Sequence, residues 1–146
     1  MKPVDVRAHR IPSTGADDVP RLALAVPKGA DVTVDGAMLE GAFETAAGTL
    51  LITTDDVPFE ETVHLVLLAD GTVRDQWDIG APYTPGVVRN LSTNGNAAAF
   101  EFAGERFRVT VNARGRLVLP GASAAGVRRR TPPWRGAHIL VEKVAE

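Results

Sequence analysis

Short apolar runs separated by turn-forming residues repeat along most of the chain. Residues 62–69 are almost uniformly apolar, which is typical of a strand covered on both faces. The next two residues, Asp70 and Gly71, predict a tight turn into 72–79. Similar runs recur about every ten residues, with a turn signal at most boundaries. The pattern predicts an all-β fold: an antiparallel β-sandwich of about eight to eleven short strands, with a partly closed β-barrel as the alternative.

Neighbouring runs are joined by residues that tolerate the backbone angles of a hairpin turn, such as Asp35-Gly36 and Arg114-Gly115. Residues 4–10 and 21–26 are also expected to form strands. The run 137–145 fits a strand or a short helix, and its β-branched residues favour the strand. The predicted hairpins join 32–34 to 37–39, 41–46 to 49–54, 62–69 to 72–79, 87–92 to 97–103, 97–103 to 106–112, and 106–112 to 116–119.

Alternation within two of these runs assigns side chains to faces, because successive residues of a strand point to opposite sides of the sheet. In 106–112 one face is expected to carry Phe107, Val109 and Val111, and the other Arg106, Arg108 and Thr110. In 72–79 one face is expected to carry Val73, Asp75, Trp77 and Ile79.

Composition fits one β domain spanning residues 1–146, of which 45% are hydrophobic. The chain has no cysteine, which excludes disulfides, thiolate metal sites and a cysteine nucleophile. Its first residues carry charges where a secretory leader would be apolar, and no run approaches the roughly 20 apolar residues that cross a bilayer. We therefore expect a soluble cytoplasmic protein without a membrane partner.

Charge is divided unevenly along the chain. Residues 1–100 carry 7 Lys and Arg against 14 Asp and Glu, a net charge of −7, whereas residues 101–146 carry 9 against 4, a net charge of +5. Such a division favours steering of a partner or head-to-tail self-association. The alternative is that strands distant in sequence pair and neutralise each other's charges.

The first candidate site is an acidic segment with four carboxylates in seven residues: Asp55, Asp56, Glu60 and Glu61. On a loop between strands these groups could bind a hard cation or supply an acid–base pair. The segment lacks the interleaved glycine of calcium loops. The alternative is a solvated loop in which Thr54, Asp55 or Asp56 closes a side-chain-to-backbone turn.

The second candidate is the loop that contains Tyr83 and Thr84 between Pro82 and Pro85. The prolines stiffen it, so the only tyrosine of the chain could stack on a ligand or donate a hydrogen bond at low entropic cost. The alternative is a crossing between sheets, with Tyr83 packed at its corner.

The third candidate is a basic segment near the C-terminal end. A cluster of cations beside a tryptophan could bind phosphates and stack a base. The chain as a whole is slightly acidic, however, so nucleic-acid binding is disfavoured, and the arginines are expected to pair with acidic groups elsewhere. The residues of this segment are Arg128, Arg129, Arg130, Trp134 and Arg135.

Other chemistry leaves weaker signals. His9, His64 and His138 fall on predicted strands and would ligate zinc only if those strands converged, so no metal is expected. The sequence contains no G-x-S-x-G motif and no glycine-rich phosphate loop, so no catalytic residue and no cofactor is expected.

The sequence favours a non-enzymatic interaction module of a bacterial-type cytoplasmic system, with a protein partner or a second copy of itself. The alternative is a small-molecule-binding barrel or pocket with weak acid–base catalysis by the 55–61 loop and Tyr83. This alternative predicts an apolar pocket beside that loop and a carboxylate whose pKa is shifted.

Overall fold

Thirteen β-strands in three antiparallel sheets, and no helix, make up the regular structure of the residues that the computed structural model describes: 1–12, 19–26, 31–57, 59–119 and 123–145. The strands are β1 (Lys2–Pro3), β2 (Arg7–Arg10), β3 (Arg21–Ala25), β4 (Val32–Asp35), β5 (Met38–Thr45), β6 (Gly48–Thr54), β7 (Val63–Ala69), β8 (Thr72–Ile79), β9 (Arg89–Asn94), β10 (Ala97–Phe102), β11 (Glu105–Arg116), β12 (Val127–Arg129) and β13 (Ala137–Val144).

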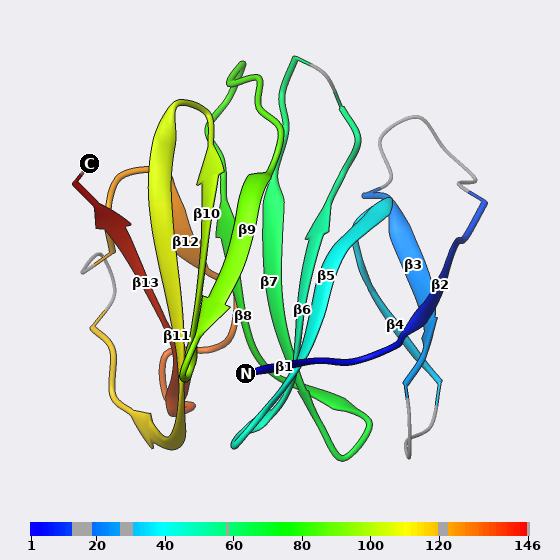
Figure 1. The fold of residues 1–146 in the computed structure, drawn as a ribbon, viewed down its shortest axis with the longest axis vertical. Coiled ribbons are helices and arrows are strands. Elements are labelled where there is room, and N and C mark those ends of the chain that lie inside the picture. Colours follow the sequence, from blue (N-terminus) through cyan, green and yellow to red (C-terminus); the bar gives the residue numbers. More distant parts are fainter. Residues whose placement is uncertain (13–18, 27–30, 58, 120–122, 146) are drawn as a thin grey trace.

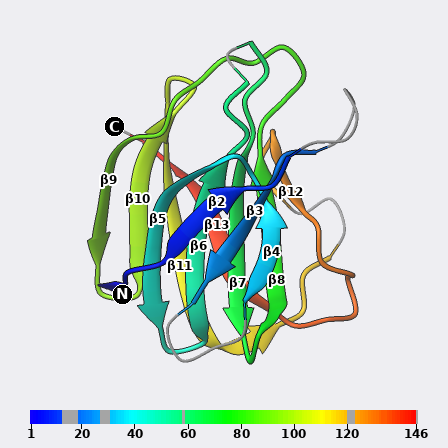
Figure 2. The same ribbon diagram turned by 90° about the vertical axis from the view of Figure 1, so that its right-hand side faces the viewer.

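The three sheets lie in layers (Figures 1 and 2). The central sheet has the order β1-β5-β6-β7-β8-β12; the sheet β13-β11-β10-β9 covers one face, and the sheet β2-β3-β4 covers part of the other. The predicted all-β sandwich is confirmed, and it has a third layer that the pattern did not indicate. None of the sheets closes into a barrel within the described residues, so the alternative fold is wrong. Without the two- and three-residue strands β1 and β12, eleven strands remain, which is the upper end of the expected range.

Two cores lie on the two faces of the central sheet. Strands β6 and β7 are buried on both sides, as the apolar run 62–69 predicts. Leu65 and Leu67 face the four-stranded sheet, where Phe100 and Phe107 stack with ring centroids 5.8 Å apart. Val66 and Leu68 face the three-stranded sheet and belong to the cluster that contains Leu22, Leu24 and Val34. Each fully buried leucine contributes about 1.5–3 kcal/mol, so both faces stabilise the fold.

Four predicted hairpins are confirmed, because their signals depend only on neighbouring residues: β5–β6, β7–β8, β9–β10 and β10–β11. The run 137–145 forms β13, the strand expected there.

The predicted hairpin at Asp35-Gly36 is wrong. Strand β4 pairs with β3, and β5 pairs with β1 and β6, so the chain passes here from the outer sheet to the central one. Gly36 has a φ of +128°, and a Cβ at this position would lie 2.5 Å from Thr53 Oγ1. The glycine is therefore required because the crossing chain lies directly on β6.

The predicted turn at Arg114-Gly115 is also wrong. Strand β11 continues to Arg116, with a shift in its register against β13 between Val111 and Arg116. A Cβ on Gly115 would lie 3.1 Å from the Cα of Gly136, so two glycines allow a close approach of the two backbones.

A bulge in β8 corrects the predicted face of Val73. Leu67 pairs with Asp75 while Leu68 pairs with Val73, which leaves Arg74 as the extra residue. Val73 therefore packs towards the three-stranded sheet, whereas Trp77 and Ile79 enter the other core. The alternation of residue types continues through the bulge, so the sequence pattern does not reveal it.

Asp75 ties this strand to its neighbours from a fully buried position. Its Oδ1 accepts hydrogen bonds from Arg129 Nε (3.1 Å), Thr131 Oγ1 (3.0 Å) and the Gln76 backbone N–H (3.1 Å). Its Oδ2 accepts from the backbone N–H groups of His138 (2.9 Å) and Ile139 (3.0 Å), and from Trp77 Nε1 (3.3 Å). One carboxylate therefore joins β8 to β12 and to the start of β13 in the next sheet.

Replacing Asp75 with Asn should destabilise the protein by roughly 3–5 kcal/mol, because the change leaves the buried Arg129 without a counter-charge and removes acceptor capacity. Equilibrium unfolding in urea measures this loss. Asp70→Asn is the matched control: Asp70 is exposed, and its positive φ of 54° suits Asn equally well. Equal midpoints for the two variants would contradict the role of Asp75.

Candidate functional site

The two loops that the sequence singles out lie side by side at one end of the sandwich (upper end of Figure 1). Residues 55–62 join β6 to β7, and residues 80–88 join β8 to β9. The Glu61 backbone N–H donates to the Thr84 carbonyl at 3.0 Å, which links the two loops directly. The predicted hairpin of 62–69 with 72–79 brings the two loops to the same end of the molecule, but nothing in the sequence indicates this particular hydrogen bond.

Glu61 organises the acidic loop from within. Its side chain is buried; Oε1 accepts from the backbone N–H groups of Asp55 (2.7 Å) and Thr62 (3.0 Å), and Oε2 accepts from that of Val57 (3.2 Å). Burial raises the pKa of Glu61 above its ordinary value, and the three backbone donors only partly offset this. The loop is therefore closed by side-chain-to-backbone hydrogen bonds, but Glu61 accepts them, not Thr54, Asp55 or Asp56 as expected.

Asp55 belongs to a second arrangement, centred on His64 of β7. Asp55 Oδ1 lies 2.7 Å from His64 Nε2, and Asp78 Oδ1 lies 2.8 Å from His64 Nδ1. Arg130 Nη1 also donates to Asp78 Oδ2 at 3.0 Å. Both ring nitrogens of His64 face carboxylates, so the imidazolium form satisfies both contacts. His64 is the one polar residue in the apolar run 63–69. This was the sequence feature that could have indicated the site, because a buried histidine needs hydrogen-bond partners.

Burial lowers the pKa of His64, but the hydrogen bonds and charges of Asp55 and Asp78 outweigh it and raise that pKa to about 9. Burial likewise raises the pKa of Asp78, but His64, Gln76 and Arg130 outweigh it and hold the pKa below the ordinary value. His64 is therefore cationic at neutral pH. Its side chain is only 3% exposed, so it joins the acidic loop to the sheet rather than meeting a ligand.

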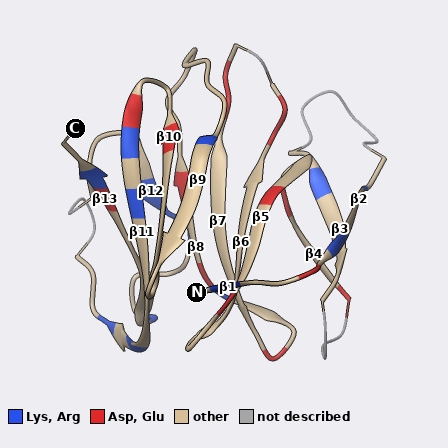
Figure 3. Cartoon of the chain, viewed as in Figure 1, with Lys and Arg blue, Asp and Glu red and all other residues tan. Residues whose placement is uncertain are grey.

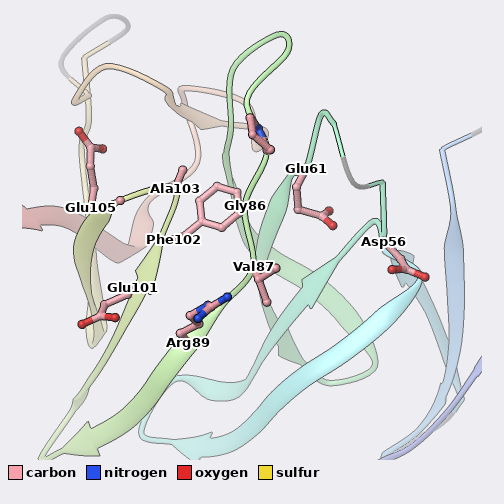
Figure 4. Close-up of a pocket in the computed structure, with 11 residues that line it drawn as sticks. Asp56, Glu61, Gly86, Val87, Arg89, Glu101, Phe102, Ala103 and Glu105 are labelled. Carbon is pink, nitrogen blue, oxygen red and sulfur yellow. The ribbon is translucent and has the colours of Figure 1, made fainter.

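A cavity of about 640 Å³ opens beside the acidic loop, between the ends of the central and four-stranded sheets (Figure 4). Asp56 and Glu61 approach it from one side, and Glu101 and Glu105 of the β10–β11 hairpin from the other. The sequence predicts only Asp56 and Glu61 at this place. Because the far wall comes from strands 40 residues along the chain, local patterns do not locate it. The remaining lining residues are Pro85, Gly86, Val87, Arg89, Phe102, Ala103 and Gly104.

The rim of this end carries exposed apolar side chains. Phe59 is 81% exposed, Tyr83 is 86% exposed, and Val57 and Val87 are 41% and 61% exposed. Tyr83 is therefore not packed at a loop corner, and it does not line the cavity. Its φ of +59° is unusual for an aromatic residue.

The remaining predicted acidic residue, Glu60, takes a separate position. It is exposed and lines another hollow, of about 330 Å³, together with Asp78 and Arg128. The four carboxylates of the loop therefore do not converge. Among the described residues no group of three His, Asp or Glu side chains is placed to hold a metal ion.

The basic segment is partly neutralised within the fold. Arg129 pairs with the buried Asp75, and Arg130 pairs with Asp78. Trp134 is 79% exposed. Figure 3 shows Lys and Arg spread over several strands, among them β3, β11, β12 and β13, rather than gathered on one face. The pairing follows from the register, because β12 lies antiparallel to β8 with Arg128 opposite Asp78 and Arg129 opposite Trp77.

The three histidines lie in three different sheets. His9 is exposed on β2, His64 is buried on β7, and His138 of β13 has its Nδ1 2.9 Å from the Asn112 carbonyl oxygen. The strands that carry them do not converge, so the three side chains do not form one site.

Comparisons with known proteins gave no match: no protein-family model, no curated protein and no solved structure is significantly similar to this chain. No helix long and apolar enough to span a bilayer occurs in the part of the chain that the structure describes.

The His64 contacts predict a loss of stability in alkali. Because the pKa of the folded state, about 9, lies above the ordinary 6.5, the stabilisation is complete below pH 6.5 and is lost as the pH rises through 9. The free energy of unfolding should fall by about 3 kcal/mol in total over this range. Thermal unfolding between pH 6 and 10 measures it.

The pH dependence of unfolding should be much weaker in His64→Gln, while His9→Gln, which changes an exposed histidine, should behave like the unmodified protein. An unmodified protein whose unfolding midpoint stays constant from pH 6.5 to 9.5 would show that His64 is not held as the cation.

Proposed function

We propose that this chain is a non-enzymatic binding module that captures a partner with the end formed by loops 55–62 and 80–88. The observation that carries the proposal is the direct contact of these loops through Glu61 and Thr84, because both loops carry exposed apolar side chains and Val87 of the second loop also lines the cavity. Loops held by a rigid β-scaffold are common binding surfaces.

The energetics of the rim support binding. Large apolar side chains exposed next to one another are unfavourable in water and mark interaction sites when they gather in a patch. Tyr83 is held between Pro82 and Pro85, so little conformational entropy is lost when it is covered. The acidic loop is fixed at its base by His64 and from within by Glu61. Both loops are therefore arranged before a partner arrives.

The charges of the cavity favour a cationic partner. Its lining includes four carboxylates, those of Asp56, Glu61, Glu101 and Glu105, against the single cation of Arg89. Glu101 and Glu105 are each paired with a cation outside the lining, Arg106 at 3.9 Å and Lys143 at 3.0 Å, so the excess of negative charge is smaller than the lining alone indicates. A Lys or Arg side chain entering the cavity would gain from this field while neighbouring apolar groups cover Phe59 and Tyr83. The partner proposed is therefore a peptide segment that combines basic and apolar residues, and the absence of cysteine favours a cytoplasmic setting.

A second candidate function is the binding of a small cationic molecule in the same cavity. The position of the cavity beside the 55–61 loop favours it, whereas the raised pKa of Glu61 opposes it, because burial favours the neutral carboxyl group. Acid–base catalysis has less support, because the Glu61 carboxylate is engaged by three backbone N–H groups and Tyr83 lies outside the lining.

Selection from a displayed library of random 12-residue peptides tests the proposal. We expect enrichment of peptides that combine Lys or Arg with aromatic or aliphatic residues. The double variant Phe59→Ser, Tyr83→Ser should bind the selected peptides at least about tenfold more weakly, because central aromatic side chains dominate the binding free energy of most interfaces. Calorimetry measures the Kd values.

The matched control is Leu117→Ser, Trp134→Ser, which changes two residues that are equally exposed but lie outside these loops. Enriched peptides that lose affinity for the control instead, or no enrichment at all, would refute the proposal. If the partner is a second copy of the chain, sedimentation should show a dimer or larger oligomer whose stability changes between low and high salt.

A further inference from the structure

Exposed apolar side chains gather at two places, towards opposite ends of the sandwich. Nine large apolar side chains are exposed among the described residues, and four of them belong to the loops of the proposed binding end. Three others lie on the segments that follow β11 and precede β13, towards the lower end of Figure 1. These three form what we call the lower patch: Leu117, Leu119 and Trp134, which are 76%, 71% and 79% exposed.

The two segments that carry the lower patch lie side by side. Strands β11 and β13 pair as far as Arg116 and Ala137, the residues from which the two segments extend. Leu119 and Pro133 line the same hollow of about 330 Å³ beside β12. Pro133 and the proline before it also restrict the backbone that leads to Trp134. The lower patch is therefore one surface, although its residues come from two parts of the chain.

Cations flank the lower patch. Of the nine Lys and Arg residues of 101–146, five form ion pairs with carboxylates. Among the described residues the other four have no carboxylate partner, and three of them adjoin the patch: Arg114, Arg116 and Arg135, all exposed. The blue segments at the lower end of β11 in Figure 3 belong to this group. The lower patch therefore combines apolar side chains with positive charge.

The proposed binding end has a complementary composition. Its acidic loop carries Asp56 and Glu60, which are exposed and form no ion pair within the described part of the chain. They lie on the same loop as the exposed Phe59, and Tyr83 is exposed on the neighbouring loop. A partner suited to this end combines basic and apolar residues, and the lower patch has that combination.

We propose that the partner captured by loops 55–62 and 80–88 is the lower patch of a second copy of this chain. Trp134 of one copy covers Phe59 and Tyr83 of the next, and the arginines beside the lower patch face the carboxylates of the acidic loop. The inference rests on the proposed function, because it names the partner of the same loops. Since the contact joins two different surfaces, each end of an assembly keeps one free surface, and growth continues beyond the dimer.

Sedimentation over a range of protein concentrations tests the proposal. The mean mass of the unmodified chain should rise with concentration and pass that of a dimer. The rise should be smaller in about 0.5 M salt, because salt screens the attraction between the acidic loop and the arginines of the lower patch.

Two double variants each remove one of the surfaces. Phe59→Ser, Tyr83→Ser keeps the lower patch, and Leu117→Ser, Trp134→Ser keeps the loops, so each variant alone should be a monomer. Their equimolar mixture should form a one-to-one dimer and nothing larger, because only one complementary pair of surfaces remains. All four changed side chains are exposed, so the variants should fold.

Charge reversal tests the arginines separately. Arg114→Glu, Arg116→Glu should weaken self-association at least about tenfold, because the reversed charges repel the acidic loop. The matched control is Arg7→Glu, Arg10→Glu, which reverses two exposed arginines of β2, away from both surfaces. The control should associate like the unmodified chain.

Three results would overturn the proposal: an unmodified chain that stays monomeric up to about 1 mM, a double variant that forms dimers by itself, or a mixture of the two double variants that stays monomeric. The peptide selection tests the loops independently. If the unmodified chain stays monomeric but its loops bind the selected peptides, only the second copy is refuted as the partner, and the proposed function stands.

Discussion

Strand β8 carries a buried carboxylate on each of its faces, and the arrangement of the molecule depends on compensating these two charges. Asp75 faces the four-stranded sheet and Asp78 faces the other side. An unpaired buried carboxylate costs several kcal/mol even after relaxation, so neither position is tolerable alone. Arg129 compensates Asp75, and His64 with Arg130 compensates Asp78.

This requirement explains why a three-residue strand forms the edge of the central sheet. Strand β12 has little apolar surface of its own, but its register places successive arginines on opposite faces of β8. Arg130 adds a backbone hydrogen bond to the Gln76 carbonyl at 2.8 Å. The division of charge along the chain is thus partly cancelled where the basic segment meets the acidic central strand.

The buried charges of β8 are also connected to the proposed binding end. Asp55, the first residue after β6, contacts His64, and His64 contacts Asp78, so the base of the acidic loop is joined to β8 through buried groups. Glu61 then closes the loop, and its backbone joins the loop that carries Tyr83. The exposed Phe59 and Tyr83 therefore stand on a fixed base. A surface of this kind loses little entropy when it binds, which is the physical advantage of preorganisation.

The sequence by itself determined the fold class, the hairpins β5–β6, β7–β8, β9–β10 and β10–β11 and the doubly buried strand β7, because period-two alternation and turn chemistry act between adjacent residues. It also located the two loops of the proposed site. It did not determine that β4 and β5 belong to different sheets, that a bulge turns Val73 to the other face, or that a third layer covers the central sheet.

The partners of His64 and Arg129, the far wall of the cavity and the contact between the two loops were likewise decided only by the tertiary structure. The partners of Arg129 and the far wall of the cavity depend on strand order between segments that are distant along the chain, whereas those of His64 depend on the register of β7 with β8, which the bulge at Arg74 shifts. Such pairings are selected by the burial of apolar surface and the compensation of charge in the whole fold, which no local pattern of residues encodes.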